Sequence, residues 1–177
     1  MNSKNLDLNG PNPTPSIIIF FPKILANTKT ARWDRYSFKN TSIQRIENLV
    51  FNKIAEYINS NPDKEFIFFP MNADTYGMSD LVSGLKIKSL VNKSNFKIWF
   101  NEPDIDELIV FMKSCEKIIS MRFHGCIFGI TASIPTTGID YGIGRVSKVK
   151  HLYNDLGIED DCLLCLSESE ISQWKII

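Results

Sequence analysis

Runs of apolar residues alternate along this chain with stretches in which apolar residues recur at helical spacing. The first run, residues 16–21, is β-branched and aromatic and is closed by Pro22, as in a strand that is buried on both faces of a parallel sheet. Apolar side chains then recur every three or four residues between Ile43 and Ile58. This spacing predicts an amphipathic helix, and Thr41 and Ser42 can cap its first turn.

The same unit repeats toward the C-terminus. A capping-box pattern starts one of the later helices, and Gly157 is placed to end another. Repeated alternation of strand and helix predicts an α/β fold, Rossmann-like, with a doubly wound parallel sheet and right-handed crossovers. The later strands are expected at residues 65–69, 96–100, 117–120, 135–139 and 162–166. The later helices are expected at residues 79–91, 123–133 and 146–156, from residue 168 onward, and over residues 108–112 behind a capping box of Asp104 and Glu107.

The length and the first residues predict the domain organisation. A chain of 177 residues has room for one domain. Residues 1–15 are polar and rich in proline, so we expect a flexible tail or linker there, followed by a single Rossmann-like domain over residues 16–177. A linker at this position suggests that a further domain or a partner subunit completes the protein.

Composition and charge narrow the class of protein. Lys plus Arg is 20 and Asp plus Glu is 20, so the net charge is zero, no overall field attracts nucleic acid, and any anion site must be local. The apolar runs are much shorter than the ~20 residues of a membrane helix. The N-terminus lacks the apolar centre of a signal peptide, so we expect a cytoplasmic protein, either free or bound peripherally to the inner face of the membrane.

The cysteines are expected to be reduced in that compartment. Cys162 and Cys165 form a C-x-x-C, but no second Cys or His pair stands at ligand spacing. Buried thiols are therefore expected here, and no metal site is predicted.

Candidate chemistry lies in the loops that follow the strands, because ligands bind beyond the carboxyl ends of the strands in a doubly wound sheet. The most informative stretch is residues 120–125, SMRFHG, between a predicted strand and the most apolar helix. The N-terminus of that helix can receive a phosphate or carboxylate, and Arg122 adds a guanidinium fork. His124 can exchange protons near neutral pH, while Gly125 and Gly129 let the helix approach the sheet.

A purely structural interpretation of the same residues is that Arg122 pairs with an acidic neighbour and that His124 is half-buried. Two polar residues at the start of so apolar a helix favour the functional interpretation, since burying them for stability alone would be costly. Asp74 and Asp80 also lie in a loop after a predicted strand and could contact sugar hydroxyls. Solvated acids are common in loops, and we favour that interpretation for both.

Residues 120–141, SMRFHGCIFGITASIPTTGIDY, resemble the signature of the polysaccharide pyruvyl transferase family, and the resemblance extends more loosely over residues 17–164. It implies the C-terminal half of a two-domain fold similar to glycosyltransferase type B, with the active site between the halves and an enzyme that is incomplete without its N-terminal half. By position, Arg122 and His124 correspond to the family's functional Arg and His. The flanking motif corresponds to Ser120, Tyr141 and Lys148.

The resemblance implies transfer of a pyruvyl group from phosphoenolpyruvate, as a ketal, to sugar hydroxyls of a surface or exopolysaccharide precursor. The acceptor would be a sugar or a lipid-linked oligosaccharide, and neither a cofactor nor a metal is called for. Arg122, Arg145 and Lys148 would hold the anionic donor, Gly125 would bring the helix close, and His124 would act as general acid or base. Where family members often carry an Arg after the first strand, this chain offers Lys23, Arg32 or Arg35.

Other interpretations of the same sequence remain open. Residues 32–36, RWDRY, could be a sugar-stacking platform or a surface for another domain. The chain could also be a sugar-nucleotide glycosyltransferase of type B fold, with a diphosphate at the same helix N-terminus. A third possibility is a noncatalytic anion-binding or interaction module, and a homo-oligomer is compatible with each of these.

Overall fold

A computed structural model describes residues 16–20, 41–72, 80–100, 105–140, 148–158, 161–164 and 168–176. The predicted tail at residues 1–15 and the cluster at residues 32–36 lie outside this part. The strands are β1 (Ser16–Phe20), β2 (Glu65–Phe68), β3 (Phe96–Ile98), β4 (Lys117–Ser120), β5 (Thr136–Asp140) and β6 (Cys162–Leu164). The helices are α1 (Thr41–Ser60), α2 (Leu81–Leu90), α3 (Ile105–Lys113), α4 (Phe123–Thr131), α5 (Lys148–Leu156) and α6 (Glu168–Ser172).

The strands form one six-stranded sheet in the order β3-β2-β1-β4-β5-β6, and every pair of neighbours is parallel. The chain runs outward from β1 to β3 and then returns to place β4 on the other side of β1. Adjacent connections therefore diverge between β1 and β4, which is the topological switch point where such sheets bind ligands. The predicted α/β fold with a doubly wound parallel sheet is confirmed.

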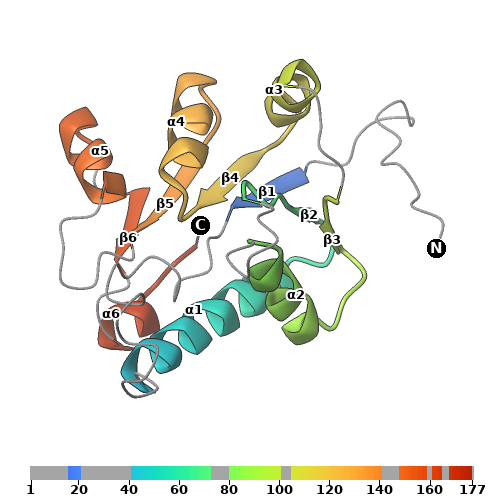
Figure 1. Ribbon diagram of the computed structural model, residues 1–177, viewed down its shortest axis with the longest axis vertical. Helices are drawn as coiled ribbons and strands as arrows, with labels where there is room; N and C mark the ends of the chain where they lie inside the picture. The colour runs from blue at the N-terminus through green and yellow to red at the C-terminus, as the bar shows by residue number, and fades with distance from the viewer. Residues whose placement is uncertain are drawn as a thin grey trace.

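Helices cover both faces of the sheet, with α1, α2 and α6 on one side and α3, α4 and α5 on the other (Figure 1). The central strand β1 shows why its sequence is continuously apolar. Ile17 and Ile19 pack in the core beneath α1, whereas Ile18 and Phe20 pack in the core on the opposite face. All four are fully buried, so neither face of this strand tolerates a polar position.

The element boundaries follow the expected ones to within a few residues. Strand β3 ends at Ile98, earlier than predicted, and a last hydrogen bond to β2 runs from the Trp99 N–H to the Phe68 carbonyl at 2.9 Å. The two aromatic residues beyond it differ: Trp99 is buried, whereas Phe100 is 70% exposed. Gly157 adopts φ +67 directly after α5 and so ends this helix, as the sequence predicts.

Helix α4 lies close against the sheet because its glycines face it. A Cβ at Gly125 would be 2.5 Å from Ser120 Oγ and 2.9 Å from the Phe20 ring. At Gly129 it would meet the hydroxyl of Thr136. The predicted role of these two glycines is thus confirmed by the packing.

Cys162 lies half-buried in β6, while Cys165 is outside the described residues. Burial raises the pKa of the Cys162 thiol to about 12, so the thiol form predominates at neutral pH. None of the described helices combines the length and apolarity needed to cross a bilayer.

Candidate active site

The candidate site is built where β4 ends and α4 begins, beside the carboxyl end of β1. Ser120 pairs with Phe20 in the sheet, and the Met121 N–H continues the ladder by donating to the Phe20 carbonyl at 2.9 Å. Both Ser120 and Met121 are fully buried. The main chain that carries Arg122 is therefore fixed to the centre of the sheet.

The Ser120 hydroxyl stabilises the turn into the helix. Its Oγ accepts a hydrogen bond from the Arg122 N–H at 3.0 Å and donates one to the Arg122 carbonyl at 2.8 Å. These two bonds close the turn within three residues. Ser120, which the sequence places in the binding motif, thus acts on the backbone of Arg122 in this structure.

Helix α4 presents its N-terminus at this turn. Arg122 is the N-cap residue with extended backbone, and the first helical bond runs from the Cys126 N–H to the Arg122 carbonyl at 3.0 Å. The N–H groups of Phe123, His124 and Gly125 precede that bond and so have no acceptor within the helix. Together with the helix dipole they favour an anion at this end.

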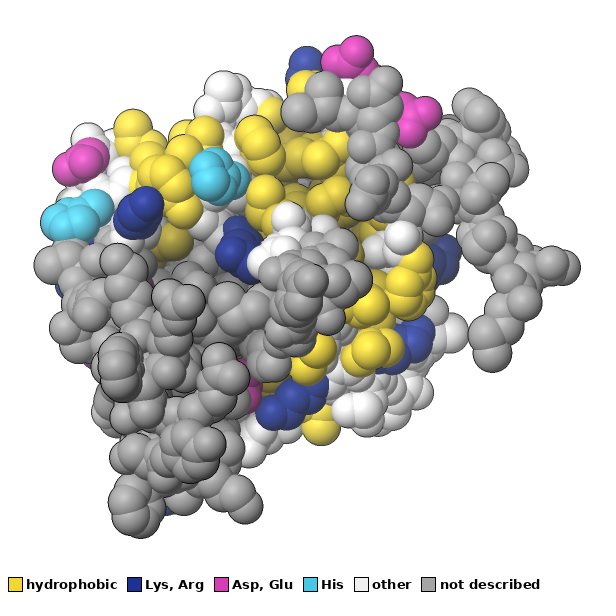
Figure 2. Space-filling view, in the orientation of Figure 1, with side chains coloured by type: hydrophobic (Ala, Val, Ile, Leu, Met, Phe, Trp, Pro, Cys, Tyr) yellow, Lys and Arg dark blue, Asp and Glu magenta, His cyan; other side chains and the backbone are white. Residues whose placement is uncertain are grey.

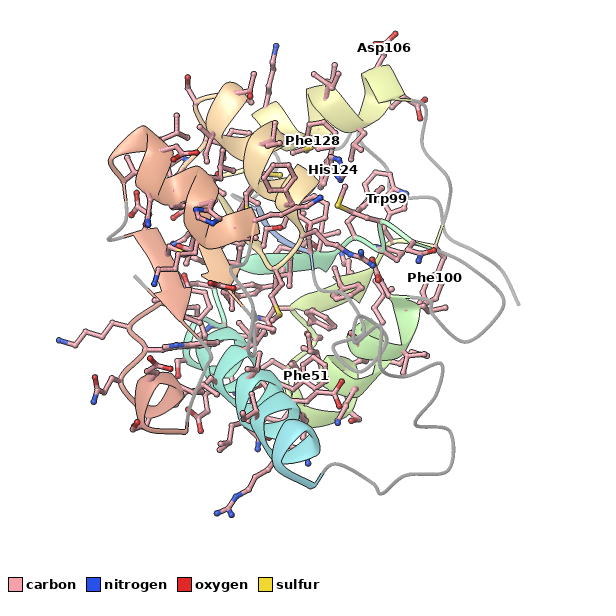
Figure 3. The ribbon with its side chains drawn as sticks, turned by 60° about the vertical axis from the view of Figure 1, so that its left-hand side comes forward. Phe51, Trp99, Phe100, Asp106, His124 and Phe128 are labelled. Carbon is pink, nitrogen blue, oxygen red and sulfur yellow. The ribbon has the colours of Figure 1, made fainter. Side chains whose placement is uncertain are left out.

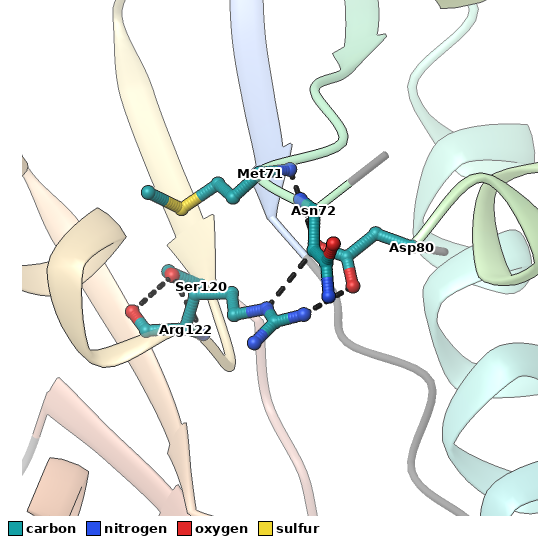
Figure 4. A network of polar contacts seen from close by, with 5 residues as sticks. All are labelled: Met71, Asn72, Asp80, Ser120 and Arg122. Carbon is teal, nitrogen blue, oxygen red and sulfur yellow. Dashed lines mark hydrogen bonds and ion pairs between the residues drawn. The ribbon is translucent and has the colours of Figure 1, made fainter. Parts of the chain in front are cut away.

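The Arg122 side chain forms an ion pair with Asp80, which lies at the entry to α2 (Figure 4). Its Nε donates to Asp80 Oδ2 at 3.1 Å, and its Nη2 donates to Oδ1. Asp80 Oδ2 also accepts the backbone N–H groups of Met71 at 3.2 Å and Asn72 at 3.1 Å. The side chain of Arg122 is 25% exposed and that of Asp80 only 1%.

Burial raises the pKa of Asp80 above its usual value. This rise is opposed by the hydrogen bonds with Arg122, by the positive charge of Arg122 and by the two backbone N–H groups, all of which lower the pKa. The predicted interpretation of Asp80 as a solvated loop acid is wrong. The structural interpretation of Arg122, that it pairs with an acidic neighbour, does describe its geometry. Asp80 stands at the N-cap of α2, a common place for Asp, yet it makes no capping bond with its side chain.

His124 lies on the surface, in the first turn of α4, so the alternative that it is half-buried is wrong. Its ring packs edge-on against Phe123, with 5.7 Å between the ring centroids. Figure 3 shows His124 projecting outward from α4. Figure 2 shows histidine side chains exposed on the face drawn, close to Lys or Arg side chains.

Lys148 comes to this site from the next helix. It is exposed at the start of α5, and its Nζ lies 5.9 Å from the centroid of the Phe123 ring, within cation–π range. The fold thus gathers five predicted site residues at one end of the sheet. They are Ser120, Arg122, His124, Gly125 and Lys148.

The remaining predicted binding residues, Tyr141, Arg145 and Arg32, lie outside the described residues, as does Asp74. The role of Asp80 could not be predicted from the sequence, because its partner is 42 residues away and follows β4, which is not adjacent to β2 in the sheet. Within the described ranges, no three His, Cys, Asp or Glu side chains are grouped so that they could hold a metal ion.

Comparison with known proteins identifies a matching family and a solved structure of similar fold. A family model described as polysaccharide pyruvyl transferase matches residues 11–143. No curated protein matches the chain. Among solved structures, a mutant of the O-GlcNAc transferase of Thermobaculum terrenum is similar, with a TM-score of 0.50 and 11% sequence identity.

That alignment covers 94% of this chain and 29% of the transferase structure. At this identity the likeness concerns the fold alone, and the neighbour is a glycosyltransferase of type B fold.

Proposed function

The chain belongs to the polysaccharide pyruvyl transferase family, and from this premise we propose that it transfers the pyruvyl group of phosphoenolpyruvate to two hydroxyls of a sugar. The product is a cyclic ketal that carries a carboxylate. We propose as acceptor a sugar or lipid-linked oligosaccharide that serves as a precursor of a surface polysaccharide or exopolysaccharide. A cytoplasmic reaction fits such a precursor, and no cofactor takes part in the proposed reaction.

The observation that supports this proposal is the convergence of Arg122 with the N-terminus of α4 at the switch point. Phosphoenolpyruvate carries a phosphate and a carboxylate, and it needs several fixed donors. Asp80 occupies Nε and Nη2 of Arg122, which leaves the Nη1 group for a ligand oxygen. The N–H groups of the first turn of α4 lie on the same short stretch of chain and suit the second anionic group.

The proposed reaction proceeds without a redox change. The methylene carbon of phosphoenolpyruvate takes a proton, and one sugar oxygen bonds to the central carbon as its hydroxyl loses a proton. The second sugar oxygen then bonds to the same carbon as the C–O bond to phosphate breaks, and its proton leaves with the phosphate. His124, exposed in the first turn of α4, is the proposed group for moving one of these protons, and Lys148 is a proposed contact of the donor.

Completion of the site by a further domain or by a second copy of the chain is part of the proposal. The predicted contacts of Tyr141, Arg145 and Arg32 with the donor or the acceptor belong to it as well.

The experiment combines phosphoenolpyruvate with a pyruvyl-accepting saccharide and measures phosphate release together with the mass of the ketal product. His124→Asn is expected to lower kcat by about 10²–10⁴, the usual contribution of a general acid or base. His151→Asn is the matched control, because His151 is also exposed but lies on α5. Equal activity of the His124 variant and the wild type would contradict the role of His124.

A sugar nucleotide is the competing donor, because a diphosphate also suits the N-terminus of α4. Titration calorimetry with phosphoenolpyruvate, uridine diphosphate and cytidine diphosphate separates the two classes. Selective binding of phosphoenolpyruvate supports pyruvyl transfer, whereas selective binding of a nucleoside diphosphate would overturn it. Anion binding that depends on Arg122, without modification of any acceptor, would indicate a noncatalytic module.

A further inference from the structure

We propose that Asp80 is a positioning residue, which holds the edge of the Arg122 guanidinium that carries Nε so that its end-on edge faces the anionic donor. The inference rests on the proposed function, since that function assigns Arg122 to the donor. It concerns a carboxylate that lies outside the motif at residues 120–125 and belongs to another part of the fold.

The hydrogen bonds of Arg122 define which edge is held. A guanidinium has five N–H donors in a rigid plane. Asp80 accepts one hydrogen bond from Nε and one from Nη2. These two bonds hold the edge of the guanidinium that carries Nε and so fix the orientation of its plane. No other hydrogen bond from this guanidinium is found in the described part of the chain. The end-on edge, with Nη1 and the second hydrogen of Nη2, therefore remains for a carboxylate or phosphate of the donor.

Asp80 is itself held firmly. It is fully buried, and Oδ2 accepts the N–H groups of Met71 and Asn72 beyond the end of β2. Its own N–H donates to the Asn72 carbonyl at 2.8 Å, and its carbonyl accepts the Ser83 N–H at 2.9 Å in the first turn of α2. A carboxylate fixed by its side chain and its backbone can fix the guanidinium that it binds.

This arrangement joins the ends of β2 and β4 across the end of β1, which lies between them. Orienting a cation before the ligand arrives lowers the entropy lost on binding. A buried carboxylate is an expensive way to attach α2 to the sheet, because apolar contacts of similar volume often stabilise a protein as well or better. Stability alone therefore does not account for Asp80.

The test is a double-mutant cycle on binding of phosphoenolpyruvate, measured by titration calorimetry. Asp80→Asn keeps the size of the side chain but points an amide group at the guanidinium, and we expect the dissociation constant to rise about 10-fold, within the coupling typical of residues in contact. In the Arg122→Ala background the same change is expected to have no further effect. Losses that add in the double variant would overturn the proposal, because a merely structural role acts independently of Arg122.

Glu47→Gln is the matched control. Glu47 is the other described carboxylate that is buried and bound to α2, where Lys86 Nζ lies 3.6 Å from its Oε2. Its substitution weakens a charged contact of α2 that involves neither Asp80 nor Arg122, so binding of phosphoenolpyruvate is expected to stay unchanged. A loss equal to that of Asp80→Asn would overturn the proposal, because it would indicate a general effect of loosening α2. If Asp80→Asn does not fold by circular dichroism, Asp80→Glu replaces it, which keeps the charge but displaces the carboxylate by one methylene group.

A second readout keeps failure of this inference distinct from failure of the proposed function. The Nε–H signal of Arg122, assigned by its loss in Arg122→Lys, is expected to exchange slowly with solvent in the wild type and rapidly in Asp80→Asn. This measurement needs no ligand. Slow exchange together with no binding of phosphoenolpyruvate would overturn the assigned donor and with it the proposal, whereas rapid exchange in the wild type would overturn the positioning itself.

Discussion

Asp80 and Asn95 connect segments at opposite ends of the same sheet. Asp80 does so as a charged acceptor of hydrogen bonds, and Asn95 as a neutral donor. At the carboxyl end, the Asp80 carboxylate gathers donors from Met71, Asn72 and Arg122. At the amino end, just before β3, Asn95 Nδ2 lies within hydrogen-bond distance of three carbonyl oxygens, at 3.3, 2.9 and 3.0 Å. These carbonyls belong to the end of α1 and the loop that follows it.

This difference in charge indicates that Asn95 contributes to the fold alone. Asn95 is neutral and uses backbone partners alone, so it holds three segments together without burying a charge. Asp80 buries a charge and engages a side-chain cation whose remaining N–H groups point elsewhere (Figure 4). A neutral amide is sufficient to join loops, so the charged pair at the carboxyl end fits a site that binds an anion.

The largest effect is expected from breaking the charged pair. Arg122→Met leaves the Asp80 carboxylate buried without its cation, which costs roughly 3–5 kcal/mol of unfolding free energy at neutral pH. Urea denaturation measures this loss, with Lys113→Met, on an exposed position of α3, as the control. A loss below about 1 kcal/mol at neutral pH would show that Asp80 is not the buried charge described here.

The same variant is expected to recover part of its stability in acid. Burial raises the folded pKa of Asp80, and removing Arg122 removes its largest opposing influence. Between the unfolded and the folded pKa the folded state binds more protons than the unfolded state, so stability rises as the pH falls through that window. Urea titrations at several pH values between 4 and 8 check the direction; a loss that grows toward low pH contradicts it.

A smaller loss of unfolding free energy is expected from removing the hydrogen bonds of Asn95. Asn95→Ala removes the donor shared by three carbonyls, and we expect a loss of about 1–3 kcal/mol, the usual cost of buried acceptors without a partner. Thermal and urea unfolding measure it. Binding of phosphoenolpyruvate should not change in this variant, since Asn95 lies at the amino end; weaker binding would mean that the two ends are not independent.

The exposed ion pair at the amino end should contribute least to stability. Lys64 Nζ binds Glu116 Oε1, and this hydrogen bond raises the pKa of Lys64, but both side chains are partly open to solvent. Glu116→Gln is therefore expected to cost only about 0.2–1 kcal/mol, and less at high salt. Unfolding measured in low and high salt tests this; a loss as large as that of Arg122→Met would remove the contrast between the two ends.

The buried thiols at the two ends of the sheet, Cys115 and Cys126, are expected to be equally unreactive in the folded protein. Cys115 precedes β4 and Cys126 follows it in α4, and burial raises their pKa values to about 12 and about 11. Both should react slowly with iodoacetamide at neutral pH in the folded protein and readily after unfolding. Peptide mass spectrometry measures each rate; rapid modification of either thiol in the folded protein contradicts its burial.

Local patterns in the sequence determined the fold class. The fully apolar run in β1 requires cover on both faces, and the helical spacing from Ile43 to Ile58 predicts α1, because both signals depend only on neighbours along the chain. The same reasoning found Arg122 and His124, since two polar residues at the start of an apolar helix are visible in one short stretch, whereas Ser120 was indicated by the resemblance to the family motif.

Only the tertiary structure decided the partner of Arg122. Asp80 resembles any acid in a loop until the sheet order places the ends of β2 and β4 on either side of β1. The pairing depends on which strands are neighbours and on how deeply Asp80 is buried, and the local spacing of residues determines neither. Periodicity therefore predicts the elements, whereas the electrostatics of the site follow from contacts that arise when distant segments pack together.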